Sequence, residues 1–103
     1  MELVDARTYR AQRPWGAHDI AVLEDASVRL HWTNEAYHWH VNDDTEVFVV
    51  VDGHVNMHVR NGDVETVVPL AAGDVLRVDA GDEHYAEPVG EARILVIERR
   101  GSE

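Results

Sequence analysis

Cysteine is absent from this chain of 103 residues. Its absence excludes disulfides, thiol nucleophiles and every soft sulfur metal ligand other than methionine. The chain also lacks a lysine or arginine cluster that could follow a phosphate backbone, with 9 basic against 20 acidic side chains and a formal charge of -11. Nucleic acid is therefore not expected as a partner, and the acidity is interpreted as a solvated surface.

Long apolar runs are missing as well. Residues 1–16 contain none of signal-peptide or membrane length, so the default expectation is a cytoplasmic protein without a membrane partner. With 45% hydrophobic residues and only three prolines, the composition is that of one ordinary globular domain. Because so short a chain buries a limited share of its surface, we expect further stabilisation from a homodimer interface or a bound ion.

From His18 onward the chain consists of short apolar runs separated by turn residues, and no helical period of 3.6 residues occurs. This pattern predicts an all-β sandwich or barrel over residues 18–98, preceded by an irregular arm at residues 1–17 and followed by a tail at residues 99–103. Ile94–Ile97 is apolar on both faces, which predicts a central strand. The expected strands are Asp19–Leu23, Ser27–Trp32, Tyr37–Val41, Glu46–Val51, His54–Arg60, Asp63–Val68, Val75–Val78, His84–Glu87 and Ala92–Glu98.

Asn61-Gly62 is the strongest turn signal, because Asn-Gly favours a two-residue hairpin loop. With these two residues as the loop, Arg60 would face Asp63 and His58 would face Glu65. Val55, Met57 and Val59 would then point inward. The alternation leaves His54 and His58 on the outside, so we interpret both as surface residues of a hairpin and not as a second metal site.

Polar residues alternate in the expected strand Tyr37–Val41 and just beyond it. His38, His40 and Asn42 occupy every second position, so they share one strand face, and Glu46 follows shortly after. A further imidazole lies far downstream at His84. Two or three imidazoles with a carboxylate are the ligands of a nitrogen and oxygen coordination sphere, so this set predicts a metal site.

The same residues resemble the first sequence motif of the cupins, written as Gly, five residues, His-x-His, three or four residues, Glu, six residues, Gly. In one register His38 and His40 are the paired imidazoles, with five residues before Glu46. In the other register the pair is His40 and Asn42, the gap to Glu46 is three residues, and Gly53 follows after six. Since His38 and Asn42 would lie about 13 Å apart on a regular strand, one ion cannot be held by both without a bulge.

The second cupin motif is Gly, five residues, Pro-x-Gly, two residues, His, three residues, Asn. Gly73, Gly81 and His84 match it, whereas Asp79 replaces the proline and Pro88 replaces the asparagine. The resemblance covers residues 18–98. It implies the cupin fold, a double-stranded β-helix or jelly-roll barrel.

The resemblance also implies a ligand set and a range of activities. His40, Glu46 and His84 would hold one divalent transition metal (Fe, Mn, Zn, Ni or Cu), with Asn42 or His38 completing the sphere. His38 is alternatively a general acid or base, or a hydrogen-bond partner of a ligand. The implied functions are isomerase, dioxygenase or lyase chemistry on an unidentified small molecule, or else non-enzymatic binding or sensing of a small ligand, with or without metal.

Overall fold

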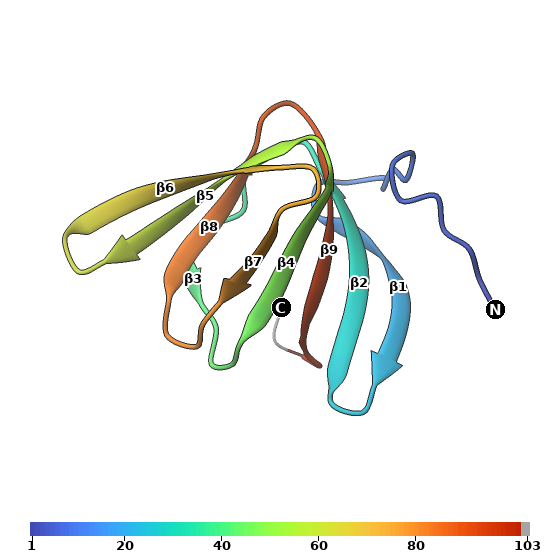
Figure 1. Ribbon diagram of the computed structural model, residues 1–103, viewed down its shortest axis with the longest axis horizontal. Helices are drawn as coiled ribbons and strands as arrows, with labels where there is room; N and C mark the ends of the chain where they lie inside the picture. Colours follow the sequence, from blue (N-terminus) through green and yellow to red (C-terminus); the bar gives the residue numbers. More distant parts are fainter. Residues whose placement is uncertain (102–103) are drawn as a thin grey trace.

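The computed structural model describes residues 1–101, which form two antiparallel sheets that face each other (Figure 1). The five-stranded sheet has the order β1-β2-β9-β4-β7 and the four-stranded sheet the order β3-β8-β5-β6. The strands are β1 (Gly16–Leu23), β2 (Ala26–Thr33), β3 (His40–Val41), β4 (Glu46–Asp52), β5 (His54–Asn61), β6 (Val64–Ala71), β7 (Val75–Val78), β8 (Glu83–Pro88) and β9 (Ala92–Arg99).

The core lies between the two sheets and follows from strand alternation. On β9, Ala92, Ile94 and Val96 are buried, whereas the residues between them are only partly covered. Val96 faces Phe48 of β4, which continues the same inner row across the sheet. The core is completed from the four-stranded sheet by the buried side chains Val55, Met57, Leu70 and Ala86.

The all-β jelly-roll fold predicted from the sequence is confirmed, and each expected run contains a strand. The expected central position of Ile94–Ile97 is also correct, because β9 lies between β2 and β4. One strand is shorter than expected: Tyr37–Val41 contributes only His40–Val41. Neighbouring side chains point in opposite directions on a strand, yet the rings of Tyr37 and His38 stack at 4.1 Å, so the chain there is not extended.

The predicted register of the β5–β6 hairpin is wrong. Asn61 pairs with Val64 and Arg60 with Glu65, so the loop is Gly62-Asp63 and not Asn61-Gly62. Gly62 has a φ of +61° and occupies the first loop position, where a type II′ turn favours glycine. The shift brings Leu70 opposite Val55, and both side chains are buried in the core.

His58 consequently does not meet Glu65. It lies opposite Val67 of β6, and its Nε2 is 2.9 Å from Glu87 Oε1 on the other neighbouring strand, β8. The expectation that His54 and His58 lie outside the core is correct, because Val55 and Met57 are buried while both histidines have accessible side chains.

The amino-terminal arm lies against the five-stranded sheet. Arg93 Nε donates to the carbonyl oxygen of Tyr9 at 2.8 Å, and the guanidinium of Arg10 lies 5.1 Å from the centre of the Trp32 ring. The extreme amino terminus extends away from the body of the molecule (Figure 1). β9 runs to Arg99, so the expected tail begins within the last strand, and its residues 102–103 lie outside the described residues. No helix in residues 1–101 is long and apolar enough to cross a membrane.

Candidate metal centre

A pocket of about 300 Å³ opens between the two sheets. Phe48, Met57 and Ala86 supply apolar parts of its wall. Four polar residues of the wall come from β3 and the segment after it, from the start of β4 and from β8, and they are the four metal ligands predicted from the sequence: His40, Asn42, Glu46 and His84.

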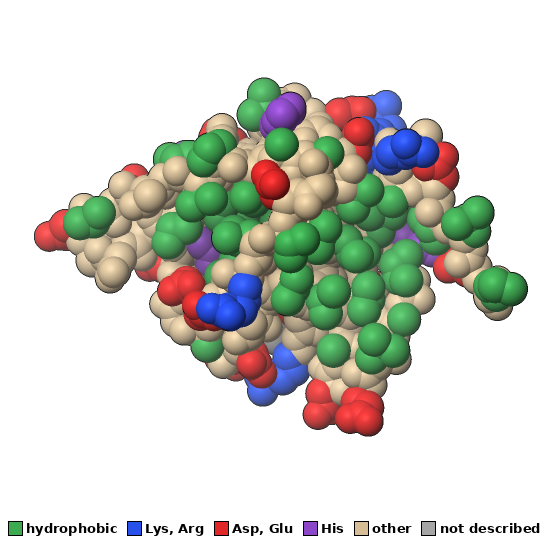
Figure 2. Space-filling view, in the orientation of Figure 1, with side chains coloured by type: hydrophobic (Ala, Val, Ile, Leu, Met, Phe, Trp, Pro, Cys, Tyr) green, Lys and Arg blue, Asp and Glu red, His purple; other side chains and the backbone are tan. Residues whose placement is uncertain are grey.

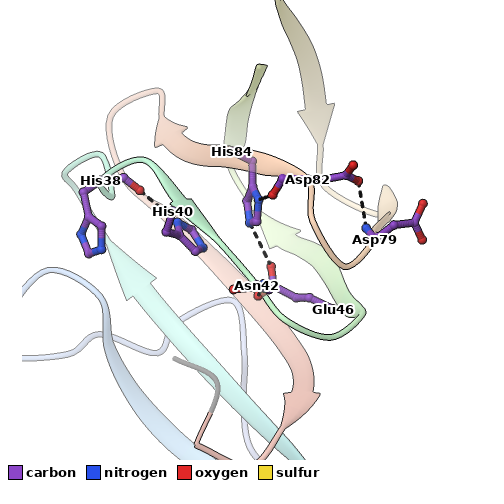
Figure 3. A network of polar contacts seen from close by, with 7 residues as sticks. All are labelled: His38, His40, Asn42, Glu46, Asp79, Asp82 and His84. Carbon is purple, nitrogen blue, oxygen red and sulfur yellow. Dashed lines mark hydrogen bonds and ion pairs between the residues drawn. The ribbon is translucent and has the colours of Figure 1, made fainter. Parts of the chain in front are cut away.

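His84 presents a nitrogen that has no hydrogen-bond partner in residues 1–101. Its side chain is 2% exposed, and its Nδ1 lies 2.8 Å from the carbonyl oxygen of Asp82, to which an Nδ1–H donates (Figure 3). With the hydrogen on Nδ1, Nε2 is the ring nitrogen that can offer a lone pair to a ligand. Among the described residues Nε2 has no hydrogen-bond partner, although it is buried. An isolated buried acceptor is costly, and a metal ion is one group that would satisfy it.

His40 is held in the same way. Its Nδ1 lies 3.0 Å from the carbonyl oxygen of His38, which again leaves Nε2 as the lone-pair nitrogen. β3 pairs with β8 so that His40 lies directly opposite His84, and the two ring centres are 4.2 Å apart. Burial lowers the pKa of the His40 imidazole below its ordinary value of 6.5, and the neighbouring His84 acts in the same direction. His40 therefore favours the neutral form that a metal ion requires.

Glu46 and Asn42 form a buried pair. The Asn42 Nδ2 donates to Glu46 Oε2 at 3.0 Å, and both residues are almost fully covered. The other carboxylate oxygen, Oε1, lies 3.9 Å from His84 Nε2. That separation is too long for a hydrogen bond, but both atoms are close enough to reach one ion at about 2.1 Å each.

The site is not closed. In residues 1–101 no three histidine, cysteine, aspartate or glutamate side chains already surround a common point as metal ligands. Coordination would therefore need rotations of the side chains. The donor set itself, two imidazoles, one carboxylate and one amide, suits a borderline divalent transition metal.

His38 lies outside the pocket, although its ring centre is 5.8 Å from that of His40. Its side chain is exposed and does not line the pocket. It stacks on the ring of Tyr37. Figure 3 shows His38 next to His40. The sequence placed it on the inward strand face, which the end of the strand at His40 prevents. Its contribution to the site is the carbonyl oxygen that holds His40. Of the two motif registers, the pair His40 and Asn42 is the one found in the pocket.

Sequence reasoning overlooked several polar residues of the pocket wall. Arg29 and His31 are two apart on β2, and Glu98 continues the inner face of β9, so strand alternation contained the signal for all three. Arg13 and Trp15 also line the pocket. They belong to the arm, and no local pattern indicates where an irregular segment folds back.

Comparison with known proteins shows which protein family this chain resembles. The cupin domain family model matches residues 31–98. An acireductone dioxygenase of Geobacillus kaustophilus is 30% identical over 100 residues, which cover 93% of this chain and 53% of that protein. A second acireductone dioxygenase, from Geobacillus thermodenitrificans, is 29% identical over the same length. This chain thus spans about half the length of these relatives.

Solved structures agree on the fold. A cupin-2 domain protein of Shewanella frigidimarina superposes with a TM-score of 0.76 at 28% identity, covering 87% of this chain and 85% of that one. A hydroquinone 1,2-dioxygenase in complex with Fe3+ superposes with a TM-score of 0.79 at 18% identity, covering 91% of this chain and 30% of that one. The second likeness concerns the fold alone.

Proposed function

This chain belongs to the cupin domain family, and from that premise we propose that it binds one divalent transition metal and acts on a small molecule in the pocket beside it. His40, Glu46 and His84 are the proposed ligands. Asn42 is the fourth, because it lies in the pocket while His38 does not. Iron, manganese, zinc, nickel and copper all suit this donor set.

The observation that carries the proposal is the free Nε2 of His84. It is buried without a hydrogen-bond partner in residues 1–101, and it lies 3.9 Å from Glu46 Oε1. A histidine used only for packing would satisfy both nitrogens or expose one to water. Backbone carbonyls hold the Nδ1 atoms of His40 and His84, as is usual for histidines that bind a metal.

The proposed reaction belongs to the dioxygenase, isomerase or lyase classes, and the acireductone dioxygenase relatives favour the first. A bound metal of this kind polarises a substrate oxygen or activates dioxygen. The chain contributes the geometry: Asn42 orients Glu46, and the carbonyls of His38 and Asp82 orient the two imidazoles. Phe48 and Met57 provide an apolar wall that limits water near the ligands.

Metal content is the first test. Untagged wild-type protein should carry close to one ion per chain by mass spectrometry, and His84→Ala and His40→Ala should lose it. His58→Ala is the matched control, because His58 is bonded to Glu87 outside the pocket and should leave the ion in place. Wild-type protein without metal, or an ion that survives His84→Ala, would contradict the proposal. If the metal-free protein turns over substrate as fast as the metal-loaded protein, the proposed role of the metal in catalysis is contradicted, but metal binding is not.

A non-enzymatic carrier or sensor is the second candidate function. It is favoured by the open arrangement of the ligands, since no three acidic or imidazole side chains in the described part of the chain already surround one point. Such a protein would bind a small molecule tightly without converting it. A thermal-shift screen of small molecules followed by product analysis distinguishes the two functions, because product formation excludes a pure carrier.

We further propose that two copies pair through the outer face of the five-stranded sheet. Two rows of opposed side chains cross this face: Val28, Ile97 and Val47 form one, and Leu95, Val49 and Val75 the other. Figure 2 shows hydrophobic side chains gathered over β2, β9 and β4 in this view. Because the chain carries a formal charge of -11, a face dominated by apolar groups is where two copies repel each other least.

A further inference from the structure

We propose that the small molecule bound in this pocket is a carboxylate and that Arg13 supplies the positive charge that selects it. The inference rests on the proposed metal site, because the charge of the pocket depends on the ion. Arg13 lies in the arm, lines the pocket and is itself exposed, whereas Glu46 and His84 are buried. The pocket therefore runs from Arg13 at its mouth to the metal ligands in its depth.

The segment that carries Arg13 is fixed to the rest of the molecule. The amide of Gly16 donates to the Arg13 carbonyl at 3.0 Å, and a Cβ on Gly16 would lie 2.5 Å from the Ala11 side chain, so the turn is tight. Trp15 has a φ of +60°, which is unfavourable for a bulky residue. Such backbone strain persists where the surroundings enforce it, often at ligand sites.

Two hydrogen bonds enforce the Trp15 conformation. Its indole Nε1 donates to the carbonyl oxygen of Glu35 at 2.9 Å, and its own carbonyl oxygen lies 3.1 Å from the ring Nδ1 of His31. The Trp15 ring also meets Tyr37 edge to face at 5.3 Å. Both rings line the same pocket as Arg13, so the pocket combines a positive charge with an aromatic wall.

Arg13 differs from the arginines that this acidic chain uses for structure. Five arginines form ion pairs with carboxylates: Arg29, Arg60, Arg77, Arg93 and Arg99. Within residues 1–101 the Arg13 guanidinium forms no ion pair or hydrogen bond. An arginine at a pocket mouth that is not committed to an internal carboxylate is available for a ligand carboxylate, which it can bind through two parallel hydrogen bonds.

The charge balance of the pocket favours the same class of ligand. Arg13 and Arg29 line it together with Glu46 and Glu98, so the formal charges of these side chains cancel. A divalent ion then leaves the pocket positive inside a strongly negative molecule. The electrostatic field of the negatively charged protein repels anions, so an anionic ligand needs a local positive site such as this pocket. The cavity of about 300 Å³ suits a small molecule with one ring or a short chain.

The test compares an acid with its uncharged amide, 4-hydroxyphenylacetate and 4-hydroxyphenylacetamide, by calorimetry on the metal-loaded protein at low salt. We expect the acid to bind roughly tenfold more tightly than the amide, as is typical for one charge-assisted contact. Arg13→Gln should remove this preference, and Arg13→Lys should keep only part of it, because lysine retains the charge but not the two parallel hydrogen bonds. Arg7→Gln is the control, because Arg7 lies in the same arm but does not line the pocket.

Metal content measured on the same samples separates the two proposals. If the ion is present and the wild type binds acid and amide equally, or binds neither, the carboxylate inference fails while the metal site stands. The inference also fails if Arg13→Gln keeps both the ion and the preference. If the wild type holds no ion, the proposed function fails and the charge argument falls with it.

Discussion

At the scale of single residues, the candidate site depends on hydrogen bonds that decide which atom of each ligand is free. The Nδ1 atoms of His40 and His84 face backbone carbonyls, and one Glu46 oxygen accepts from Asn42. The atoms that remain, two Nε2 nitrogens and one Oε1 oxygen, are those a metal ion would use. The two imidazoles are therefore oriented by carbonyl oxygens that need not touch the ion, whereas Asn42 orients Glu46 and is itself the proposed fourth ligand.

Replacing Asn42 tests its bond to Glu46. Asn42→Asp removes the donor and puts a second carboxylate beside a buried one, so the metal-free protein should lose about 1–3 kcal/mol of unfolding free energy. Added divalent ion should reduce this loss, because it binds the folded state. The measurement is urea unfolding in chelator and in excess metal. Asn34→Asp, at an exposed position, should change stability by less than about 0.5 kcal/mol, and equal losses in both variants would contradict the prediction.

His40 gives the metal-free protein a pH dependence. Its folded-state pKa is below the ordinary value of 6.5, chiefly because of burial, so below 6.5 the unfolded chain binds the proton more readily. The unfolding free energy should therefore fall as the pH drops below 6.5 and show no His40 contribution well above it.

Urea unfolding across this pH range should show a shallower decline in His40→Gln than in wild type. His54→Gln is the control, because His54 is exposed on β5. If the unfolding free energy declines with falling pH as steeply in His40→Gln as in wild type, His40 is not the source of the pH dependence.

Much of the site could be predicted from single residues. His40, Asn42, Glu46 and His84 were found from strand alternation and motif spacing, and the pocket contains all four. Their role as ligands remains a prediction. His38 matched the same alternation but lies outside the pocket, because the strand begins only at His40. Arg13 was missed, since its position depends on contacts between the arm and residues far along the chain.

At the scale of elements, the strands were predictable and their pairing was less so. Period-two alternation and turn residues located every strand, because both signals are local. The β5–β6 register was not predicted correctly. The hairpin could use either of two loops, Asn61-Gly62 or Gly62-Asp63. Both registers place the same residues on the inner face, so the alternation of apolar and polar residues does not distinguish them. The distinction depends on placing Leu70 opposite Val55, which is a long-range packing effect.

Two turn glycines provide a test at this scale. Gly62 has a φ of +61° and open space where a Cβ would lie, so Gly62→Ala should cost only the backbone strain, about 1 kcal/mol. Gly53 has a φ of +86°, and a Cβ there would lie 2.7 Å from the Glu91 carbonyl oxygen. Gly53→Ala should therefore lose more, roughly 2–4 kcal/mol. Chemical denaturation measures the loss of unfolding free energy in each variant. If Gly53→Ala loses no more than Gly62→Ala, the close contact with the Glu91 carbonyl oxygen is relieved by local movement.

At the scale of the whole molecule, the two sheets have different outer faces. The outer face of the four-stranded sheet carries polar groups such as His58 and Glu87, which bond to each other at 2.9 Å. The corresponding face of the five-stranded sheet carries valine, leucine and isoleucine on adjacent strands. Apolar side chains on both faces of β9 suit a strand that is covered twice, once by the core and once by a partner.

Pairing through this face can be broken by one charge. Val49 lies between Leu95 and Val75 in one of the outer rows, so Val49→Lys would bury an unpaired ammonium at the interface. We expect wild type to sediment as a dimer and Val49→Lys to weaken the dimer by roughly a hundredfold. Val67→Lys is the matched control, because Val67 is an exposed valine on β6 of the other sheet and should leave the dimer intact. A monomeric wild type, or equal weakening by both lysines, would mean that this sheet face does not join two copies, and the apolar rows would then need another partner.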